Sequence, residues 1–389
     1  MRIGSVRGEW VELCLKQAAI RLSRAHVLYG FCVRERLSSE GIGNMRHGSA
    51  NLDVLRSIAV SLVVISHLLI EHVGHGEGIY STQILGTLGV LIFFVHTCLV
   101  LMLSLERQAM KDRQDPGTIP FLVARAFRIY PLSIVVVSVV VFIDWASASG
   151  HHGGWAVLSN LLLIQNITGH ESVPPVLWSL PFELQMYLFL PTLYLFVSMS
   201  GRFARYGIGL LWIGMVVVIL AVWRLGWDYS LIMFFPCFIP GVLAYSLRDA
   251  TKQLAPGLLF AFVGTMAIAY PWIVGHGVKA TMLSWPICLA LGIMIPYCRE
   301  IESVKLAKLG EIVARYSFGI YLTHVPMINF SFHFLHKQPA VISWIVFFVG
   351  TGALSFLAYH LIEKPCTDFG KALSERMKSH QLQAKSNIS

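Results

Sequence analysis

The chain has 389 residues, of which 56% are hydrophobic and 13% charged, and its mean hydropathy is +0.66. A soluble domain is about one quarter charged, so this composition excludes an ordinary cytosolic enzyme, a disordered chain and a nucleic-acid-binding module. The apolar residues form repeated runs of about 18 to 23, each long enough to cross a hydrocarbon core about 30 Å thick. The sequence therefore predicts a polytopic membrane protein, in which the formal charge of +9 reflects topology rather than an acidic partner.

Ten apolar stretches are long enough to span the membrane, and an eleventh, residues 155–168, is shorter and contains several polar residues. If 155–168 does not cross, the side that holds both termini carries 26 of the 30 Lys and Arg residues and the other side three. If it crosses, the two sides carry 16 and 13. The positive-inside rule thus predicts cytoplasmic termini and a re-entrant or interfacial 155–168. The expected spans are 52–70, 84–105, 129–146, 177–197, 206–223, 229–247, 256–274, 280–297, 316–335 and 340–362.

We expect an all-α bundle of about ten transmembrane helices and divide the chain into three parts. Residues 1–49 are a basic cytoplasmic segment, in which a start at Met45 would make residues 1–44 an extension. Residues 50–368 are the membrane domain. Residues 369–389 are a charged C-terminal tail that we expect to fray.

The first span carries two ionisable residues on one face. Arg56 and His67 are eleven residues apart, which is three helical turns, so His67 lies about 16 Å farther along the helix, in the outer half of the membrane. An ionisable residue at that depth indicates function by default. The alternative is an Arg56 that snorkels to the interface and a histidine that is hydrogen-bonded within the packing.

A further ionisable residue enters the membrane in the segment VPPVLWSLPFELQMYLFLP, residues 173–191. Trp178 is at interface depth, and Glu183 is about 9 Å into the span, a depth compatible with His67. A carboxylate beside an imidazole orients it and stabilises its protonated form, as a general base requires. The alternative is an ion pair of Glu183 with another buried residue.

Two arginines lie at the cytoplasmic end of the third span, in FLVARAFRIYP. Arg125 and Arg128 are three residues apart and project together from a helix. Paired guanidinium groups suit the bidentate recognition of phosphates. Positive-inside anchoring and binding of anionic lipids predict the same residues.

Near the C-terminus, Tyr321 and His324 lie one turn apart, and Pro326 frees a carbonyl beside His324. A hydrogen-bonded packing histidine is the alternative to a functional one. Glu363, at the depth of Arg56 and Arg128, predicts a salt bridge that closes the bundle. The loop histidines 72, 75, 151 and 152 lack accompanying Cys or clustered carboxylates, so we expect no metal.

Six segments of the chain resemble motifs of the membrane acyltransferase family 3 and occur in the order found in that family. The family includes bacterial O-antigen, exopolysaccharide and nodulation-factor O-acetyltransferases. The six segments are LDVLRSIAVSLVVISH, GTLGVLIFFVHTCLV, ARAFRIYPL, LWSLPFELQMYLFLP, RYSFGIYLTHVP and LIEKP, and the resemblance covers roughly residues 50–368. It implies a ten-helix domain that moves an acyl group from cytosolic acyl-CoA to a carbohydrate across the membrane. It also implies essential roles for Arg56 and His67, and places Arg125 and Arg128 near the donor.

The chain departs from the family pattern at two places. After FFV the family usually has Ser-Gly, where this chain has His96-Thr97-Cys98, and after WSL the family often has two consecutive acids, where Glu183 is followed by Leu184.

We therefore expect an inner-membrane O-acyltransferase that carries an acetyl group from acyl-CoA to a hydroxyl of a cell-surface polysaccharide or lipid-linked glycan. Acyl-CoA is a substrate, and no permanently bound cofactor is expected. The expected site comprises His67 as general base, Glu183 as the group that orients it, Arg56, Arg125 and Arg128 on the donor phosphates, and Trp178, Tyr321 and His324 in support. The rival hypothesis is a proton-coupled transporter or flippase, since intramembrane His and Glu and the proline-broken FFPCFIPG (residues 234–241) suit a carrier equally.

Overall fold

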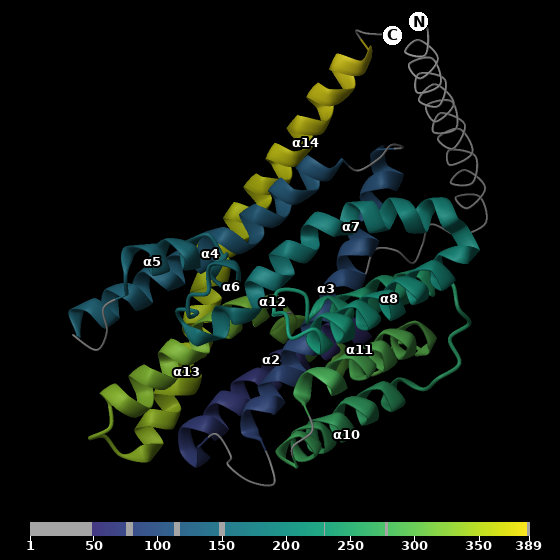
Figure 1. Cartoon of the computed structure of the whole chain (residues 1–389). Coiled ribbons are helices and arrows are strands. Elements are labelled where there is room, and N and C mark those ends of the chain that lie inside the picture. Colours follow the sequence, from purple (N-terminus) through teal and green to yellow (C-terminus); the bar gives the residue numbers. More distant parts are fainter. Residues whose placement is uncertain are drawn as a thin grey trace, which may run out of the picture.

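The computed structural model describes residues 49–74, 81–112, 117–147, 152–228, 230–276 and 279–386. Apart from one isolated bridge between Leu254 and Cys298, every regular element in these ranges is a helix (Figure 1). The α-helices are α2 Ala50–Val73, α3 Thr82–Asp112, α4 Thr118–Ala146, α5 Gly154–Leu161, α6 Gln165–Thr168, α7 Leu180–Ser200, α8 Ala204–Arg224, α9 Phe235–Ser246, α10 Pro256–Gly275, α11 Ala280–Tyr297, α12 Val304–Ile328, α13 Ala340–Ala358 and α14 Lys364–Ser386. Two 3-10 helices, η1 Pro175–Ser179 and η2 Gly201–Phe203, and two π-helices, η3 Asn329–Phe334 and η4 Tyr359–Glu363, complete them.

Seven helical stretches among the described residues are long and apolar enough to cross a membrane, which makes the chain a multi-pass membrane protein. Helix α9, with 12 residues, is too short for this criterion, and the first half of α12 carries four charged residues. Helices α7 and α8 form one stretch because η2 joins them without a break. The number of ten spans and the side on which the termini lie remain predictions.

Residues 155–168 do not form a single helix. The chain turns at Leu163, whose φ of 54° is in the left-handed region, between the short helices α5 and α6. Buried Asn160 donates to the carbonyl oxygen of Glu171 and accepts from the backbone N–H of Val173. The segment is thereby folded back against the residues that lead into η1, and it is not one of the seven candidate spans.

Helix α2 is held close to α3 and α12 by small residues. A Cβ at Gly89 of α3 would lie 2.5 Å from the carbonyl oxygen of Ala59, and one at Gly310 of α12 would lie 2.6 Å from a Val54 methyl group. Because glycine has no side chain, α2 can approach α3 and α12 closely at these two positions, as is common between transmembrane helices. This contact brings the Arg56–His67 face of α2 against α12.

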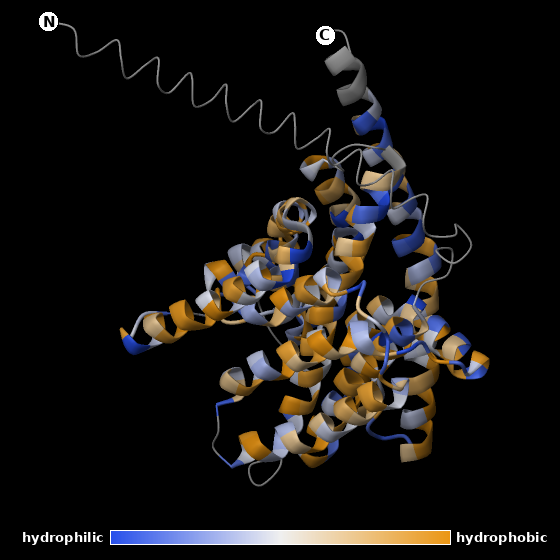
Figure 2. Cartoon of the chain, turned by 90° about the vertical axis from the view of Figure 1, so that its right-hand side faces the viewer, coloured by the Kyte–Doolittle hydropathy of each residue, from blue (hydrophilic) through white to orange (hydrophobic). Residues whose placement is uncertain are grey.

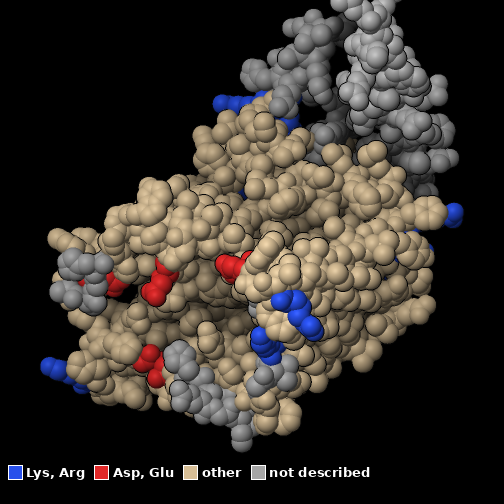
Figure 3. All heavy atoms as spheres, viewed as in Figure 1, with Lys and Arg blue, Asp and Glu red and all other residues tan. Residues whose placement is uncertain are grey.

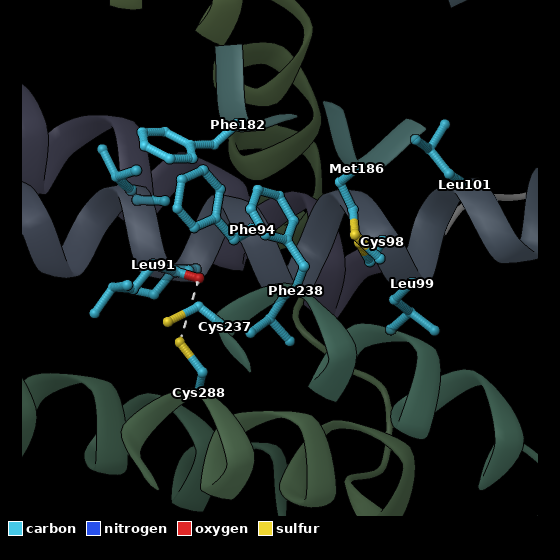
Figure 4. Packing of buried hydrophobic residues seen from close by; sticks show 14 of the residues in the cluster. Leu91, Phe94, Cys98, Leu99, Leu101, Phe182, Met186, Cys237, Phe238 and Cys288 are labelled. Carbon is cyan, nitrogen blue, oxygen red and sulfur yellow. Dashed lines mark hydrogen bonds between the residues drawn. The ribbon is translucent and has the colours of Figure 1, made fainter. Parts of the chain in front are cut away.

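The buried core lies around α3. The ring of Phe94 stacks on that of Phe238 from α9 with centroids 4.0 Å apart, and Cys237 and Cys288 lie beside them (Figure 4). The Cys288 thiol donates a long hydrogen bond, 3.9 Å, to the Leu91 carbonyl oxygen. Among the described cysteines, Cys98, Cys237, Cys288, Cys298 and Cys366 are free.

The outer surface of the bundle is apolar. Large hydrophobic side chains such as Phe142, Val139 and Leu210 are exposed, and Figure 2 shows hydrophobic colour over most of the helices. On the face in Figure 3, Lys, Arg, Asp and Glu occupy only a few isolated places. Such a surface is stable only in contact with lipid.

The C-terminal tail, for which fraying is predicted, is helical among the residues described, and α14 continues to Ser386. Its first half packs against α4: the rings of Phe369 and Phe127 lie 5.3 Å apart, and a Cβ at Gly370 would lie 2.4 Å from Phe127. Aromatic contact with α4 offsets part of the entropy of ordering this segment. Most of the predicted N-terminal segment, residues 1–48, lies outside the described residues.

Candidate functional site

The face of α2 predicted from the eleven-residue spacing packs against α12 at both of its ionisable residues. The Nε of Arg56 donates to Ser317 Oγ at 2.7 Å, and His67 Nδ1 lies 3.4 Å from His324 Nε2. Each partner is buried in α12. One helix pair therefore holds both ends of the site.

An inner cavity of about 60 Å³ lies within the bundle. Its residues divide into two groups along the helix axes. The end near Arg56 is polar, with Thr97, Arg128, Glu183, Tyr187 and Ser317. The opposite end is largely apolar, with Val90, Phe93, Leu180 and the hydroxyl groups of Ser179 and Tyr321, and the lining is completed by Phe94, Ile129 and Phe318. Thr97 and Val90 are seven residues apart on α3, and Ser317 and Tyr321 are four apart on α12, so the two ends are separated by about 6–10 Å along the helices.

A second and wider cavity, of about 250 Å³, adjoins the first; we call it the mouth. Arg56 and Arg128 line both cavities, and so they stand where the mouth meets the inner cavity. The other residues that line the mouth are Asp53, Glu311, Ala314, Arg315, Tyr359 and Glu363. Since Glu311 and Arg315 pair with each other at 2.6 Å, the charge of the two shared arginines is balanced at the mouth mainly by Asp53 and Glu363.

The predicted salt bridge at Glu363 is confirmed. Arg128 Nη2 lies 3.8 Å from Glu363 Oε1, and Glu363 is buried with only 4% of its side chain exposed. Its second carboxylate oxygen has no hydrogen-bond partner. Glu363 ends the π-helix η4, a local widening of the helix that is frequent at functional sites.

The predicted pairing of Glu183 with His67 is not formed. Glu183 accepts a short hydrogen bond from the Tyr187 hydroxyl, one turn along α7, and lines the polar end of the inner cavity beside Arg56. The hydrogen bonds of His67 go instead to Val63 and His324. The depth estimate was too coarse, since Glu183 lies level with Arg56, three turns of α2 away from His67.

Hydrogen bonds to backbone carbonyls determine which ring nitrogens of the two histidines carry hydrogen. His324 Nδ1 lies 3.0 Å from the Ile320 carbonyl oxygen, which can only accept, so Nδ1 is protonated and Nε2 has a free lone pair. His67 Nδ1 lies 2.9 Å from the Val63 carbonyl oxygen and 3.4 Å from that lone pair, so it also carries the hydrogen. His67 Nε2 is thereby left unprotonated in the neutral ring, as a proton acceptor requires.

The two arginines of the third predicted span occupy different surroundings. Arg128 lines both cavities, whereas Arg125 lines neither. The Arg125 guanidinium lies over the ring of Phe121 at 5.6 Å, and its buried Nε has no hydrogen-bond partner. A buried and unsatisfied guanidinium nitrogen is costly, so Arg125 retains capacity for another acceptor.

The predicted supporting residues also differ. Tyr321 is buried, lines the inner cavity, and its ring centroid is 6.2 Å from that of His324, which contacts His67. Trp178 does not line the cavity; its ring packs on Phe234 at 5.2 Å and on Phe182 at 6.4 Å. Trp178 therefore supports the wall behind the site rather than the site itself.

Four polar cavity residues were not singled out from the sequence: Thr97, Ser179, Tyr187 and Ser317. Tyr187 could have been found from its spacing of four to Glu183, which places both on one helix face. Thr97 was noted only as a departure from the family pattern. Hydroxyl residues carry little signal in an apolar sequence, and which of them face a cavity depends on the rotation of each helix.

Within the described part of the chain, no three His, Cys, Asp or Glu residues are grouped as a metal site would require. His152 binds Asp144 at 3.0 Å, and His72 packs between Phe332 and Trp344. His75 and His151 lie outside the described residues.

The described residues thus form a multi-pass helical membrane bundle with two arginines at its cavities and a histidine pair three turns farther along α2. The chain belongs to acyltransferase family 3: the family model, described as an acyltransferase domain, matches residues 49–360. The chain is therefore a membrane acyltransferase, which decides against the transporter hypothesis. No match was found among curated proteins or among solved structures.

Proposed function

We propose that the protein transfers an acyl group, acetyl in the first instance, from cytosolic acyl-CoA to a hydroxyl of a surface polysaccharide or lipid-linked glycan at the inner membrane. The observation that carries the proposal is the continuous arrangement of mouth, paired arginines and inner cavity, with the histidine pair beyond its apolar end. A donor with an anionic head and a long, narrow arm has the shape and charge that this arrangement would accept.

The phosphates of the donor would bind at Arg56 and Arg128. Arg56 is already oriented by Ser317, and Arg128 by Glu363, so little side-chain entropy remains to be lost on binding. Guanidinium groups bind phosphate through two parallel hydrogen bonds. Arg125, one turn away on α4, would add long-range attraction and a free Nε–H.

The arm of the donor would enter the inner cavity and bring the thioester to its apolar end. Glu183 lies at the polar end with Tyr187, where it balances part of the arginine charge and leaves the remainder for the donor. It is a donor-site residue in this proposal, no longer the group that orients His67. Since Glu183→Gln keeps the size and the acceptor oxygen, it should change the KM for acyl-CoA more than kcat.

His67 would act as the general base. Its Nε2 takes the proton of the acceptor hydroxyl while the hydroxyl oxygen attacks the thioester carbon, and the C–S bond then breaks. The proton passes from His67 to the departing thiolate, which leaves as free CoA thiol. Loss of a general base typically lowers the rate by about 10²- to 10⁴-fold.

The test is acyl transfer by the purified full chain in lipid nanodiscs, with labelled acetyl-CoA and a panel of surface glycans and lipid-linked precursors. We expect release of CoA that depends on a glycan, and its loss in His67→Gln. His276→Gln is the matched control, because His276 Nδ1 also lies 2.8 Å from the carbonyl oxygen four residues earlier, but His276 directly follows α10 and lines neither cavity. Full activity of His67→Gln, or equal loss in both variants, would refute the proposed role.

A further inference from the structure

The apolar end of the inner cavity contains one pair of hydroxyl groups among its described lining residues. Ser179 Oγ and Tyr321 Oη are 2.7 Å apart, and Tyr321 Oη also donates to the Val176 carbonyl oxygen at 2.6 Å. Both side chains are 4% exposed and both line the cavity. The remaining residues at this end, such as Phe93 and Leu180, present only apolar side chains.

The hydrogen of each hydroxyl can be assigned from these contacts. The Val176 carbonyl oxygen can only accept, so the Tyr321 hydrogen points to it. The Ser179 hydrogen must then be the one between the two hydroxyl groups, donated to Tyr321 Oη. Tyr321 is fixed by a backbone carbonyl, whereas the Ser179 hydroxyl can rotate to another acceptor without disturbing the backbone.

Ser179 also occupies a position where a serine ordinarily has a different role. It is the N-cap residue of α7, where a serine side chain usually accepts a hydrogen bond from the first turn of the helix. Here its side chain makes no capping hydrogen bond and contacts Tyr321 across the cavity instead. Because η1 runs directly into α7, the Leu180 N–H donates to the Leu177 carbonyl oxygen, and the Ser179 hydroxyl is not needed as a cap.

Thioester transfer places negative charge on the carbonyl oxygen as the acceptor oxygen attacks. Enzymes stabilise this oxyanion with hydrogen-bond donors placed in a site free of water. Arg56 and Arg128 are held at the polar end of the cavity, Arg56 by Ser317 and Arg128 by Glu363. Among the lining residues described, Ser179 is the donor at the apolar end that can turn to it.

We infer that Ser179 donates a hydrogen bond to the oxyanion of the donor thioester, and that Tyr321 is a positioning residue that holds the serine hydroxyl at the cavity wall. The inference rests on the proposed function. In this step the acceptor oxygen bonds to the carbonyl carbon, His67 takes the hydroxyl proton, and the carbonyl π electrons move to the oxygen that Ser179 contacts. The electrons return as the C–S bond breaks, and the thiolate takes the proton from His67.

The test compares kcat and the KM for acetyl-CoA in Ser179→Ala, Ser179→Thr and Tyr321→Phe in nanodiscs. Removal of one oxyanion donor typically costs about 10²- to 10³-fold in kcat, so Ser179→Ala should lose about that much with an unchanged KM. Ser179→Thr keeps the hydroxyl and should recover most of the rate. Tyr321→Phe should lower kcat about tenfold, which is the equivalent of one hydrogen bond.

The chain offers a matched control at α10 and α11. Tyr270 Oη lies 2.9 Å from Ser284 Oγ and donates to the Ala280 carbonyl oxygen at 3.0 Å, so the same three groups occur in a buried setting outside both cavities. Ser284→Ala and Tyr270→Phe should lower thermal stability as much as the cavity variants do. They remove the same kind of hydrogen bond, but away from both cavities, so their kcat should stay within about twofold of the parent value.

The inference is overturned if Ser179→Ala retains its kcat, if only its KM changes, or if Ser284→Ala loses kcat equally. If Ser179→Ala does not accumulate, the kcat values of Ser179→Thr and Tyr321→Phe are compared with those of the control pair. A Tyr321→Phe variant that keeps its kcat as the control pair does would then overturn the inference. Failure of the proposed function looks different, because His67→Gln would then be active or the parent chain would release no CoA. An essential His67 together with a dispensable Ser179 refutes the inference alone.

Discussion

Replacing Arg128 by Ala separates donor binding from the stability of the bundle. Arg128 lines both cavities and pairs with buried Glu363 at 3.8 Å, so the substitution removes a phosphate ligand and also leaves a carboxylate without its cation. The two consequences can be measured independently. Glu363→Gln, which removes the charge and keeps the shape, distinguishes them.

The expected effect on the donor follows from one charge-assisted hydrogen-bonding group. Such bonds contribute about 1.5–3 kcal/mol, and 1.4 kcal/mol is tenfold, so the KM for acetyl-CoA should rise about 10- to 150-fold. The kcat should change much less, since the phosphates do not react. Arg315→Ala is the matched control, because Arg315 also lines the mouth but is exposed and already paired with Glu311 at 2.6 Å.

The expected effect on stability follows from the burial of Glu363. The salt bridge itself contributes about 1 kcal/mol at most, because the Arg128 side chain is 33% exposed. The larger cost, about 1–3 kcal/mol, is that of leaving a buried carboxylate without a partner. Arg128→Ala should therefore lower the thermal midpoint in nanodiscs, and the double variant Arg128→Ala/Glu363→Gln should restore most of it.

The assay combines initial rates against acetyl-CoA concentration, CoA binding by calorimetry and thermal unfolding followed by tryptophan fluorescence. We expect the double variant to recover stability and to keep the raised KM. A KM that returns to the parent value with stability would show that Arg128 is a structural residue. Unchanged KM in Arg128→Ala would refute the assignment of the mouth to the donor.

Three further predictions follow from the same arrangement. Arg125→Ala should raise the KM for acyl-CoA less than Arg128→Ala, since Arg125 lines neither cavity; a larger rise would relocate the phosphates along α4. If His67 and His324 act as a unit, His324→Leu should lower kcat by at least about tenfold. The double variant His67→Gln/His324→Leu should then have the same kcat as His67→Gln alone. Additive losses in kcat would mean independent roles. A topology reporter fused to the C-terminus should be cytoplasmic and one inserted at Gly153 should be external, and an external C-terminus would make residues 155–168 a true span.

The sequence by itself determined what depends on one segment at a time. Apolar runs predicted the helices, because a chain in lipid must satisfy its backbone hydrogen bonds within each segment. The spacing of Arg56 and His67 predicted that they share a face of α2, since helical periodicity alone decides it. Contact between Arg128 and Glu363 was also predictable, because few partners are available to a carboxylate at that depth.

Only the tertiary structure decided the contacts between helices. Depth along the membrane normal made Glu183 a plausible partner of His67, but the orientation of α7 in the bundle places it at the end of the cavity lined by Arg56. His324 is the partner of His67 because close packing of α2 on α12 brings the two rings within 4.9 Å. The place of Ser179 opposite Tyr321 likewise results from the chain path through η1, a geometry that no local pattern in the sequence encodes.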